Sequence, residues 1–314
     1  MVYGRTMPTG NRACWIHAPA KINLTLEVLG RRPDGYHDIR SLLVPLSLAD
    51  RIEIRESERE QFDVVADGVD LAAIGPSGEN LVRRAANLVR RRAGVSQPLA
   101  VRLVKRIPVG GGLGGGSADA AAMLVALNRL WNLGWTRETL IGLGQELGSD
   151  VPGLVHGGAV RLEGRGERVA AAWPGARGRV PQIPVLLVNP GTAVSTAEVY
   201  RTFSGGLTSA PNSYTIVHSA LLGGNLRAAA GGLFNSLEAG VLQKYPAVGR
   251  VAQLLKAAGA AGVLLSGSGA TVFALVGDVE QGERIRRDLP GDLWSRVTWT
   301  LPDGVMAAHG FLEP

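Results

Sequence analysis

A glycine-rich stretch in the middle of the chain has the residue types that bind phosphate. Six of the seven residues from 110 to 116 are glycine, and Ser117 follows them directly. An alternating apolar segment precedes the glycines and an alanine-rich segment follows Ser117, so the pattern predicts a strand, a loop and a helix. Free backbone N–H groups and the positive end of a helix then meet at one point, which favours phosphate. We expect Ser117 to cap this helix and to reach a phosphate or a bound Mg²⁺.

The glycine stretch differs from two common nucleotide-binding loops. A P-loop needs a lysine before its Ser or Thr, whereas Ser117 here follows a glycine and precedes Ala118. A spaced match to the dinucleotide fingerprint exists at Gly110, Gly112 and Gly115. The strands before it alternate, however, which fits a sheet with one solvated face better than a parallel sheet buried on both faces. An oxidoreductase is therefore a distant alternative.

Lysine is rare in this chain, so its few positions are informative. Of the 33 basic residues only four are lysines, at positions 21, 105, 244 and 256. Where arginine is the default cation, a lysine indicates a need for a compact point charge. Lys21 and Lys105 both fall in segments that could carry chemistry.

Composition and charge exclude several classes of protein. The 314 residues allow one large domain or two ordinary ones. A net charge of +6 permits an anionic partner, but aromatic residues make up only 5% and none lies among the arginines, which argues against nucleic-acid binding. No window reaches the roughly 20 apolar residues of a membrane span. The start lacks a secretory signal and the chain has one cysteine, Cys14, so we expect a cytoplasmic protein.

The elements that must position these residues can be read from periodicity and from turn signals. A proline- and glycine-rich stretch at 171–184 is the best candidate boundary, which predicts domains at 1–175 and 176–314. Residues 1–13 are predicted to be a poorly ordered tail. The predicted strands are 22–29, 51–56, 61–66, 99–107, a pair within 156–169, 185–188, and two around the glycines of 263–276. The strands 51–56 and 61–66 are predicted to form a hairpin. The predicted helices are 79–94, 117–133 and 136–148.

Four segments together resemble the GHMP kinases, a family named for galactokinase, homoserine kinase, mevalonate kinase and phosphomevalonate kinase. PVGGGLGGGS at 108–117 is similar to the family's ATP-binding loop. APAKINLTLEVLG resembles its N-terminal motif, LGSDVPGLVHGG resembles the segment with its catalytic aspartate, and LLSGSGATVFAL resembles its C-terminal glycine motif. The segments occur in the family's order from about residue 18 to 275. The resemblance implies an α+β fold of two lobes: an N-terminal lobe of the ribosomal protein S5 domain 2-like type and a ferredoxin-like C-terminal lobe, with ATP and substrate in the cleft between them.

Within this family, one branch fits best. RRPDGYHDIRSLLVPLSLADRI, PGTAVSTAEVY and FNSLEA resemble the kinases that phosphorylate the 2-hydroxyl of a CDP-linked methylerythritol in the non-mevalonate route to isoprenoids. The resemblance implies Asp150 as the general base and Lys21 as its charge partner, with ATP and Mg²⁺ as cofactors. It implies substrate contacts from Asn23, Tyr36, His37, Asp150, Thr196, Gly267, Ser268 and Gly269. It implies ATP contacts from Asn80, Lys105, Pro108, Gly110, Gly111, Gly112, Leu113, Gly114, Gly115, Gly116, Ser117 and Ala118.

The chemistry suits these residue types. An alcohol must lose a proton as it attacks a γ-phosphoryl group, a carboxylate can accept that proton, and a lysine can stabilise the transferring charge. A neutral imidazole has one donor and one acceptor, which suits cytosine. Ser117 is the weak candidate for a Mg²⁺ ligand. Each residue also has a plainer interpretation: Asp150 as a helix cap, Lys21 as a solvated strand-end charge, His37 as a surface residue, and the Gly267–Gly269 loop as a simple chain reversal.

The sequence departs from the family pattern in three places. Gly153 and Leu154 replace two aromatic residues, which predicts looser packing near Asp150. Ser236 stands where the branch has an acid, and Ala118 replaces a second hydroxyl residue. The alternatives are a homoserine or mevalonate kinase, which would not need a GYH segment for a base, and a nucleotide-binding regulator, which would not need the Lys21 and Asp150 pair. The oligomeric state, monomer or homodimer, stays open.

Overall fold

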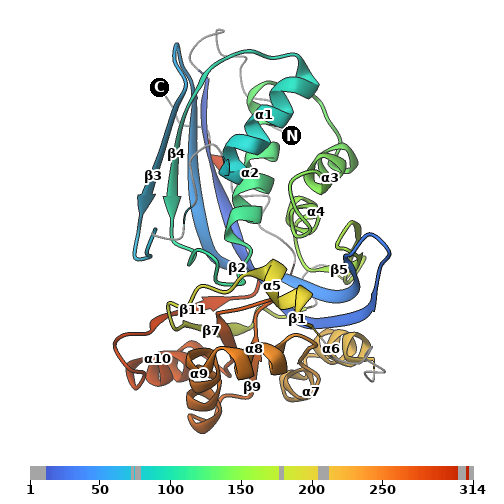
Figure 1. The fold of residues 1–314 in the computed structure, drawn as a ribbon, viewed down its shortest axis with the longest axis vertical. Coiled ribbons are helices and arrows are strands. Elements are labelled where there is room, and N and C mark those ends of the chain that lie inside the picture. The colour runs from blue at the N-terminus through green and yellow to red at the C-terminus, as the bar shows by residue number, and fades with distance from the viewer. Residues whose placement is uncertain are drawn as a thin grey trace.

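The computed structural model describes residues 12–71, 74, 79–176, 180–203 and 212–302, and the backbone of 309–310. Within these residues the chain forms two β-sheets, each with helices packed against it (Figure 1). The predicted N-terminal tail lies outside the described residues except for its last two positions, and Ala13 already begins the first strand. Among the described helices, none combines the length and the apolar composition that crossing a bilayer requires.

The larger sheet is built on two long antiparallel strands that pair from Ala13↔Arg55 to Arg31↔His37. Its main strand order is β12-β1-β2-β4-β3, with β5 joined to β2 and β8 joined to β1. The predicted pair within 156–169 is confirmed as the antiparallel β5–β6 hairpin. The strands of this sheet are β1 (Ala13–Arg31), β2 (His37–Glu56), β3 (Gln61–Ala66), β4 (Leu99–Lys105), β5 (Val160–Gly164), β6 (Arg168–Ala171), β8 (Phe234–Asn235) and β12 (His309–Gly310).

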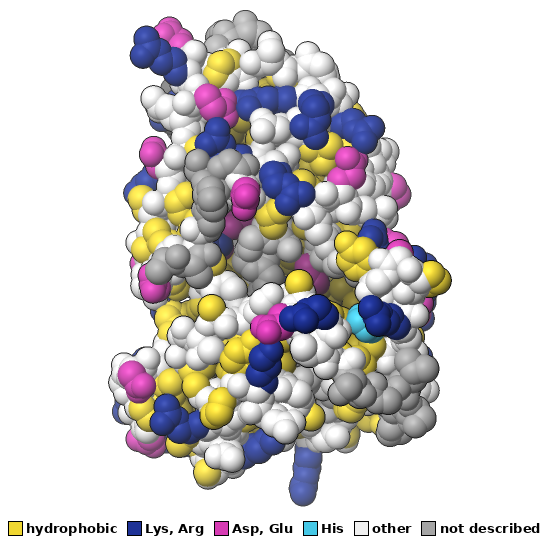
Figure 2. All heavy atoms as spheres, in the orientation of Figure 1, with side chains coloured by type: hydrophobic (Ala, Val, Ile, Leu, Met, Phe, Trp, Pro, Cys, Tyr) yellow, Lys and Arg dark blue, Asp and Glu magenta, His cyan; other side chains and the backbone are white. Residues whose placement is uncertain are grey.

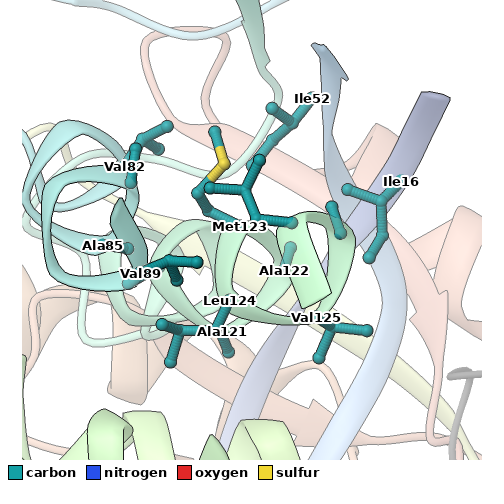
Figure 3. Packing of buried hydrophobic residues seen from close by; sticks show 14 of the residues in the cluster. Ile16, Ile52, Val82, Ala85, Val89, Ala121, Ala122, Met123, Leu124 and Val125 are labelled. Atoms are coloured by element: carbon teal, nitrogen blue, oxygen red, sulfur yellow. The ribbon is translucent and has the colours of Figure 1, made fainter. Parts of the chain in front are cut away.

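Helices from the middle of the chain cover one face of this sheet (Figure 1). Asn80 caps the first of them through its side chain, and Gly94 ends it in the left-handed conformation. The next helix is buried on almost every side because its alanines let the sheet and the neighbouring helices approach closely. Figure 3 shows Met123 and Val125 of this helix packed with Val82, Ile16 and Ile52. These helices are α1 (Leu81–Ala93), α2 (Gly115–Leu130), α3 (Arg137–Gln145) and α4 (Val151–His156).

The second sheet has the antiparallel strand order β11-β7-β10-β9. β9 and β10 are the two strands predicted around the C-terminal glycines, and they pair from Gly262↔Leu275 to Leu265↔Val272. The strands are β7 (Pro184–Asn189), β9 (Gly262–Leu265), β10 (Val272–Leu275) and β11 (Trp294–Trp299). The accompanying helices are α5 (Thr196–Arg201), α6 (Ser213–Leu222), α7 (Leu226–Gly231), α8 (Glu238–Lys244), α9 (Pro246–Ala257) and α10 (Val279–Arg287).

The predicted hairpin between 51–56 and 61–66 is wrong. β4 lies between these two segments, antiparallel to β2 and parallel to β3. The chain leaves β3, passes through α1 and returns in β4, as two parallel neighbouring strands require, because their connection must span the length of the sheet. This crossover places the end of β4 beside β2, at Arg51↔Val104. The glycine stretch after it reaches β1, where the Lys21 N–H donates to the Leu113 carbonyl oxygen at 2.9 Å.

Candidate functional site

A cavity of about 960 Å³ lies where the two sheets meet. Figure 2 shows this face of the molecule hollowed across its middle, with Lys and Arg side chains near the lower rim of the hollow. Most of the predicted site residues line the cavity: Lys21, Asn23, Tyr36, His37, Asn80, Lys105, Pro108, Gly110, Gly111, Gly112, Gly114, Gly115, Gly116, Ser117, Asp150, Thr196, Gly267 and Ser268. Leu113, Ala118 and Gly269 are not among its lining residues; Leu113 and Ala118 are buried in the hydrophobic cores.

Lys21 and Asp150 meet although they are far apart in the sequence. The Lys21 Nζ lies 3.1 Å from Asp150 Oδ2 and donates a hydrogen bond of 2.9 Å to Asn23 Oδ1. Asn23 in turn donates to Ser41 Oγ at 2.8 Å, which fixes the orientation of its amide. Lys21 is buried, whereas the Asp150 side chain is 30% exposed toward the cavity. Asp150 occupies the cap position of α4 but makes no side-chain capping bond, so its carboxylate is available for chemistry.

The space left by the absence of side chains in the glycine stretch is filled mainly by other parts of the protein. A Cβ at Gly112 would lie 2.2 Å from the Ser266 carbonyl oxygen, and one at Gly114 would lie 2.8 Å from Lys21 Cε. A Cβ at Gly111 would meet side chains of the second sheet. At Gly110, with φ +68°, nothing lies within 4 Å of the position. The glycines therefore let the glycine stretch pack against Lys21 and the 266–269 loop. Gly110 borders the open part of the cavity.

The C-terminal glycine loop is held in place by side chains from three segments. The Thr196 and Ser268 hydroxyls lie 2.7 Å apart at the cavity wall. Asn235 donates through its amide to the carbonyl oxygens of Leu265 and Gly267, at 2.9 and 2.7 Å. Ser236, which stands where the branch has an acid, accepts a hydrogen bond from the Val28 N–H at 2.9 Å. The FNSLEA run thus positions the loop against β1.

Part of the cavity wall is aromatic. The His37 ring lies 5.5 Å from the Tyr200 ring and 6.1 Å from the Phe203 ring, measured between centroids. Burial, followed by the charge of Arg31, lowers the pKa of His37, so the imidazole is neutral at pH 7. Tyr36 is more than half exposed and its ring lies beneath the Arg165 guanidinium. A flat, neutral, nitrogen-containing ring could stack against such surfaces.

A buried polar cluster adjoins the glycine stretch on the side of β4. Lys105 Nζ contacts the carboxylates of Asp50 and Asp119, the latter at 2.7 Å. Asp50 also accepts the backbone N–H groups of residues 106 and 107. Asp119 lines the cavity, and its Oδ1 has no hydrogen-bond partner. Burial raises the pKa of Asp119 to about 7, against the attraction of Lys105 and with the Asp50 charge adding to the rise.

The structure corrects the expectation of loose packing near Asp150. A Cβ at Gly153 would lie 3.1 Å from Leu162 and 3.2 Å from Val160, so the glycine allows α4 to pack closely on β5. Leu154 is buried in the core beside α2. At both positions that depart from the family pattern, the chain near Asp150 is therefore closely packed.

Several cavity residues were missed by the sequence analysis. Tyr200 follows Thr196 by one helical turn of α5, and this i, i+4 spacing could have identified it. Asp119 sits in the same relation to Gly115 on α2. Ser149 and Arg165 also line the cavity, but neither belongs to a periodic pattern that points there.

Among the described residues no group of three or more His, Cys, Asp and Glu side chains could hold a metal ion. Mg²⁺ in kinases is held by one or two protein groups together with the phosphates of the nucleotide. The Ser117 hydroxyl on the first turn of α2, which lines the cavity, fits that arrangement.

Comparison with known proteins agrees with this geometry. Residues 80–159 match the model of the GHMP kinases N terminal domain, and residues 217–294 match that of the GHMP kinases C terminal domain. The fold is similar to that of a homoserine kinase from Cytophaga hutchinsonii, with a TM-score of 0.73 and 17% identity over 99% of this chain and 100% of the other. The chain belongs to the GHMP kinase family, and its two-lobed α+β fold is that of these kinases.

The sequence relatives are more specific. The chain is 44% identical to a 4-diphosphocytidyl-2-C-methyl-D-erythritol kinase of Pelotomaculum thermopropionicum, over 85% of this chain and 91% of the relative. It is 40% identical to the kinase of that name from Bacillus pumilus, over 87% and 92% of the two chains. A crystal structure of 4-(cytidine 5'-diphospho)-2C-methyl-D-erythritol kinase superimposes with a TM-score of 0.76 and 33% identity, over 91% of this chain and 99% of the other. Within the family, the chain therefore groups with the 4-diphosphocytidyl-2-C-methyl-D-erythritol kinases.

Proposed function

We propose that this chain transfers the γ-phosphoryl group of ATP to the 2-hydroxyl of 4-diphosphocytidyl-2-C-methyl-D-erythritol. The observation that supports this most directly is the contact between Lys21 and Asp150, 3.1 Å apart, on the wall of a cavity lined by the glycine stretch and by the GYH segment. The identity of the substrate is taken from the names of the relatives described above. The product would be the 2-phosphate of that compound, together with ADP.

In this proposal Asp150 accepts the proton of the attacking hydroxyl. Lys21 orients the carboxylate and stabilises negative charge on the group in transfer, which is the main requirement of phosphoryl transfer. Asn23 holds the Lys21 ammonium on its other side. Because the aspartate side chain is 30% exposed and the lysine side chain only 5%, the substrate hydroxyl would meet the carboxylate first.

The remaining lining residues divide between the two substrates. The phosphates of ATP would be held by the glycine stretch, Ser117 and the start of α2. The Ser117 hydroxyl would also be a ligand of Mg²⁺. Asn80 and Lys105 would lie beside the nucleotide. Tyr36 and His37 would hold the cytosine, the first by stacking and the second by hydrogen bonds. Thr196 and the 267–269 loop would line the polyol side. We further propose that the chain works in the cytoplasm, as a monomer or homodimer, without nucleic acid or membrane partners.

The test is ADP release in a coupled assay with ATP, Mg²⁺ and each of three acceptors: the CDP-linked methylerythritol, homoserine and mevalonate. Turnover is expected with the CDP compound alone. Asp150→Asn keeps the side-chain shape but accepts no proton, so kcat should fall by roughly 10²- to 10⁴-fold. Asp292→Asn, at an exposed residue outside the cavity, is the matched control and should keep full activity.

Each other outcome excludes part of the proposal. Turnover with homoserine or mevalonate would overturn the roles of Tyr36 and His37. Nucleotide binding without turnover of any acceptor would favour a non-catalytic regulator. Full activity of Asp150→Asn would remove the aspartate from the chemistry.

A further inference from the structure

Arg165 is a cation of the cavity wall that nothing in the function proposed so far uses. It belongs to the turn between β5 and β6, and its side chain lines the cavity. The Arg165 guanidinium carbon lies 4.7 Å from the centroid of the Tyr36 ring. The cation therefore reaches the end of the cavity where the base is proposed to bind.

The same turn is fastened to the catalytic segment. Gly166 has φ +114°, and a Cβ there would lie 2.4 Å from the carbonyl oxygen of Ser149, the residue before Asp150. The Arg165 backbone N–H donates to the Glu167 carboxylate, which closes the turn. The backbone of Arg165 is thus held beside Ser149, while its side chain extends to Tyr36.

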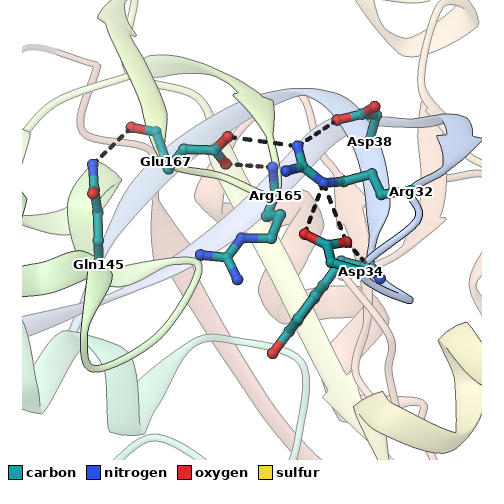
Figure 4. A network of polar contacts seen from close by, with 7 residues as sticks. Arg32, Asp34, Asp38, Gln145, Arg165 and Glu167 are labelled. Carbon is teal, nitrogen blue, oxygen red and sulfur yellow. Dashed lines mark hydrogen bonds and ion pairs between the residues drawn. The ribbon is translucent and has the colours of Figure 1, made fainter.

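The neighbouring carboxylates are engaged by another cation. Arg32 lies 3.2 Å from Asp34, 3.1 Å from Asp38 and 3.9 Å from Glu167. In Figure 4 the Arg165 backbone meets Glu167, whereas its guanidinium extends away and no dashed line reaches it among the residues drawn. Within the described residues, no carboxylate lies within ion-pair distance of that guanidinium. Arg32 thus forms the ion pairs with these carboxylates. Arg165 acts on Asp34 only through its charge, so its guanidinium can bind an anion from the cavity.

The order of groups in the substrate indicates which anion this is. The substrate carries a base at one end and the reacting polyol at the other, joined by a diphosphate. If the base lies at Tyr36 and the hydroxyl at Asp150, the diphosphate must pass between them. Arg165 connects these two places, because its turn packs against Ser149 and its guanidinium lies over Tyr36. A planar guanidinium binds phosphate oxygens through two parallel N–H donors, and stacking on a tyrosine face leaves those edges free.

We propose that Arg165 binds the diphosphate of the substrate and thereby selects a cytidine diphosphate over cytidine or its monophosphate. The inference rests on the proposed function, because it takes the positions of base and hydroxyl from it. Stacking on Tyr36 holds the guanidinium in place before the substrate arrives. Arg165 is in this view a specificity-determining residue, separate from the proton transfer at Asp150.

The test compares cytidine, CMP and CDP as probes, by calorimetric titration of the wild-type chain and of Arg165→Gln. The variant should bind CDP about tenfold to a hundredfold more weakly, as expected when a charged hydrogen bond is lost. Its affinity for cytidine should not change. Arg165→Lys should recover part of the CDP affinity, because it keeps the charge without the bidentate geometry. Arg161→Gln, on the same hairpin but outside the cavity, is the matched control and should bind all three like the wild type.

The outcomes separate this inference from the proposed function. An equal loss for cytidine and CDP would show that Arg165 only shapes the base site, and would overturn the proposal. Unchanged CDP affinity in Arg165→Gln would also overturn it, even with normal turnover of the CDP compound by the wild type. Failure of the wild type to phosphorylate that compound, with intact CDP discrimination, would instead overturn the function alone. A normal far-UV spectrum and melting temperature are required of each variant.

Discussion

Lys21 illustrates how a buried cation is retained beside a reactive carboxylate. Its ammonium is almost wholly inaccessible, so its charge must be balanced by nearby oxygens. Asp150 and Asn23 provide them at 3.1 and 2.9 Å. Removing either oxygen would leave a buried charge short of partners, which costs more than an intact pair contributes. The pair therefore couples the stability of the site to its chemistry.

Asp119 provides a prediction at the residue scale. Its pKa rises from 3.8 to about 7 in the folded chain, with Lys105 and Asp50 as the charged groups that face it. Between these two pH values the folded state holds a proton that the unfolded state has released, so stability falls as pH rises. Asp119→Asn is neutral throughout and mimics the protonated acid. We expect the variant to be more stable than the wild type at pH 8, by on the order of 1 kcal/mol.

Urea unfolding at pH 4.5, 6 and 8 measures this difference. The gap between Asp119→Asn and wild type should widen from pH 4.5 to 8 and level off above pH 7. The exposed Asp292→Asn control should show no such widening. A gap that is constant with pH would mean that the folded chain does not hold the Asp119 proton.

At the scale of elements, the segments that follow a simple local rule could be predicted from sequence. α1 has an asparagine cap, helical spacing and a terminal glycine, and it forms at Leu81–Ala93 as expected. The strands on either side of the C-terminal glycine loop also form. In these cases the residues that predict the element lie within about 16 positions of one another. No distant segment changes how the element pairs or packs.

The wrong prediction concerns strand pairing, because a strand can pair with a segment that is distant in the sequence. β2 and β3 alternate as hairpin strands do and are separated by a short loop, but β4 pairs with both of them. A strand, a helix and a strand in sequence (β3, α1, β4) are the signature of a parallel crossover, and this signal was available. The contact of Lys21 with Asp150 came from family resemblance, since no local spacing relates residues 129 positions apart. Arg165 has no periodic signal at all.

The two glycine loops give a prediction at this scale. Gly110 and Gly112 both have positive φ, so alanine at either position is strained by roughly 1–2 kcal/mol. Only at Gly112 would the new Cβ also collide with backbone, 2.2 Å from the Ser266 carbonyl. We expect Gly112→Ala to destabilise the chain by a further 1–3 kcal/mol or so relative to Gly110→Ala, the usual cost of overpacking. The measurement is the free energy of unfolding of both variants in urea.

Gly110→Ala serves as the matched control because it shares the strain and lacks the collision. Equal stability of the two variants would show that the loops do not need their close contact. If Gly110→Ala loses no more stability than this backbone strain but also loses affinity for ATP, the open space at that position would be assigned to the nucleotide.

On the scale of the whole molecule, side chains from the two sheets pack together in a common hydrophobic cluster. A single cluster of buried side chains includes Ile22 and Leu42 of the first sheet with Val185 and Phe273 of the second. Hydrogen bonds also cross between the sheets: Leu48 N–H donates to the Thr298 hydroxyl at 2.9 Å. The proposed boundary near residue 175 thus divides the sequence without dividing this shared cluster.

We therefore expect the chain to unfold in one cooperative transition. Urea unfolding followed by far-UV circular dichroism should coincide with loss of amide protection in peptides from β4 and from β10, which lie in different sheets. Phe273→Ala removes a fully buried ring from the shared cluster and should lower the free energy of unfolding by about 3–5 kcal/mol, shifting both peptides together. Separate midpoints for β4 and β10 would show two independent units. The cavity would then lie between two domains that unfold independently, and substrate binding would have to bring them together. A single midpoint would instead mean that folding itself positions Asp150 against the glycine loops.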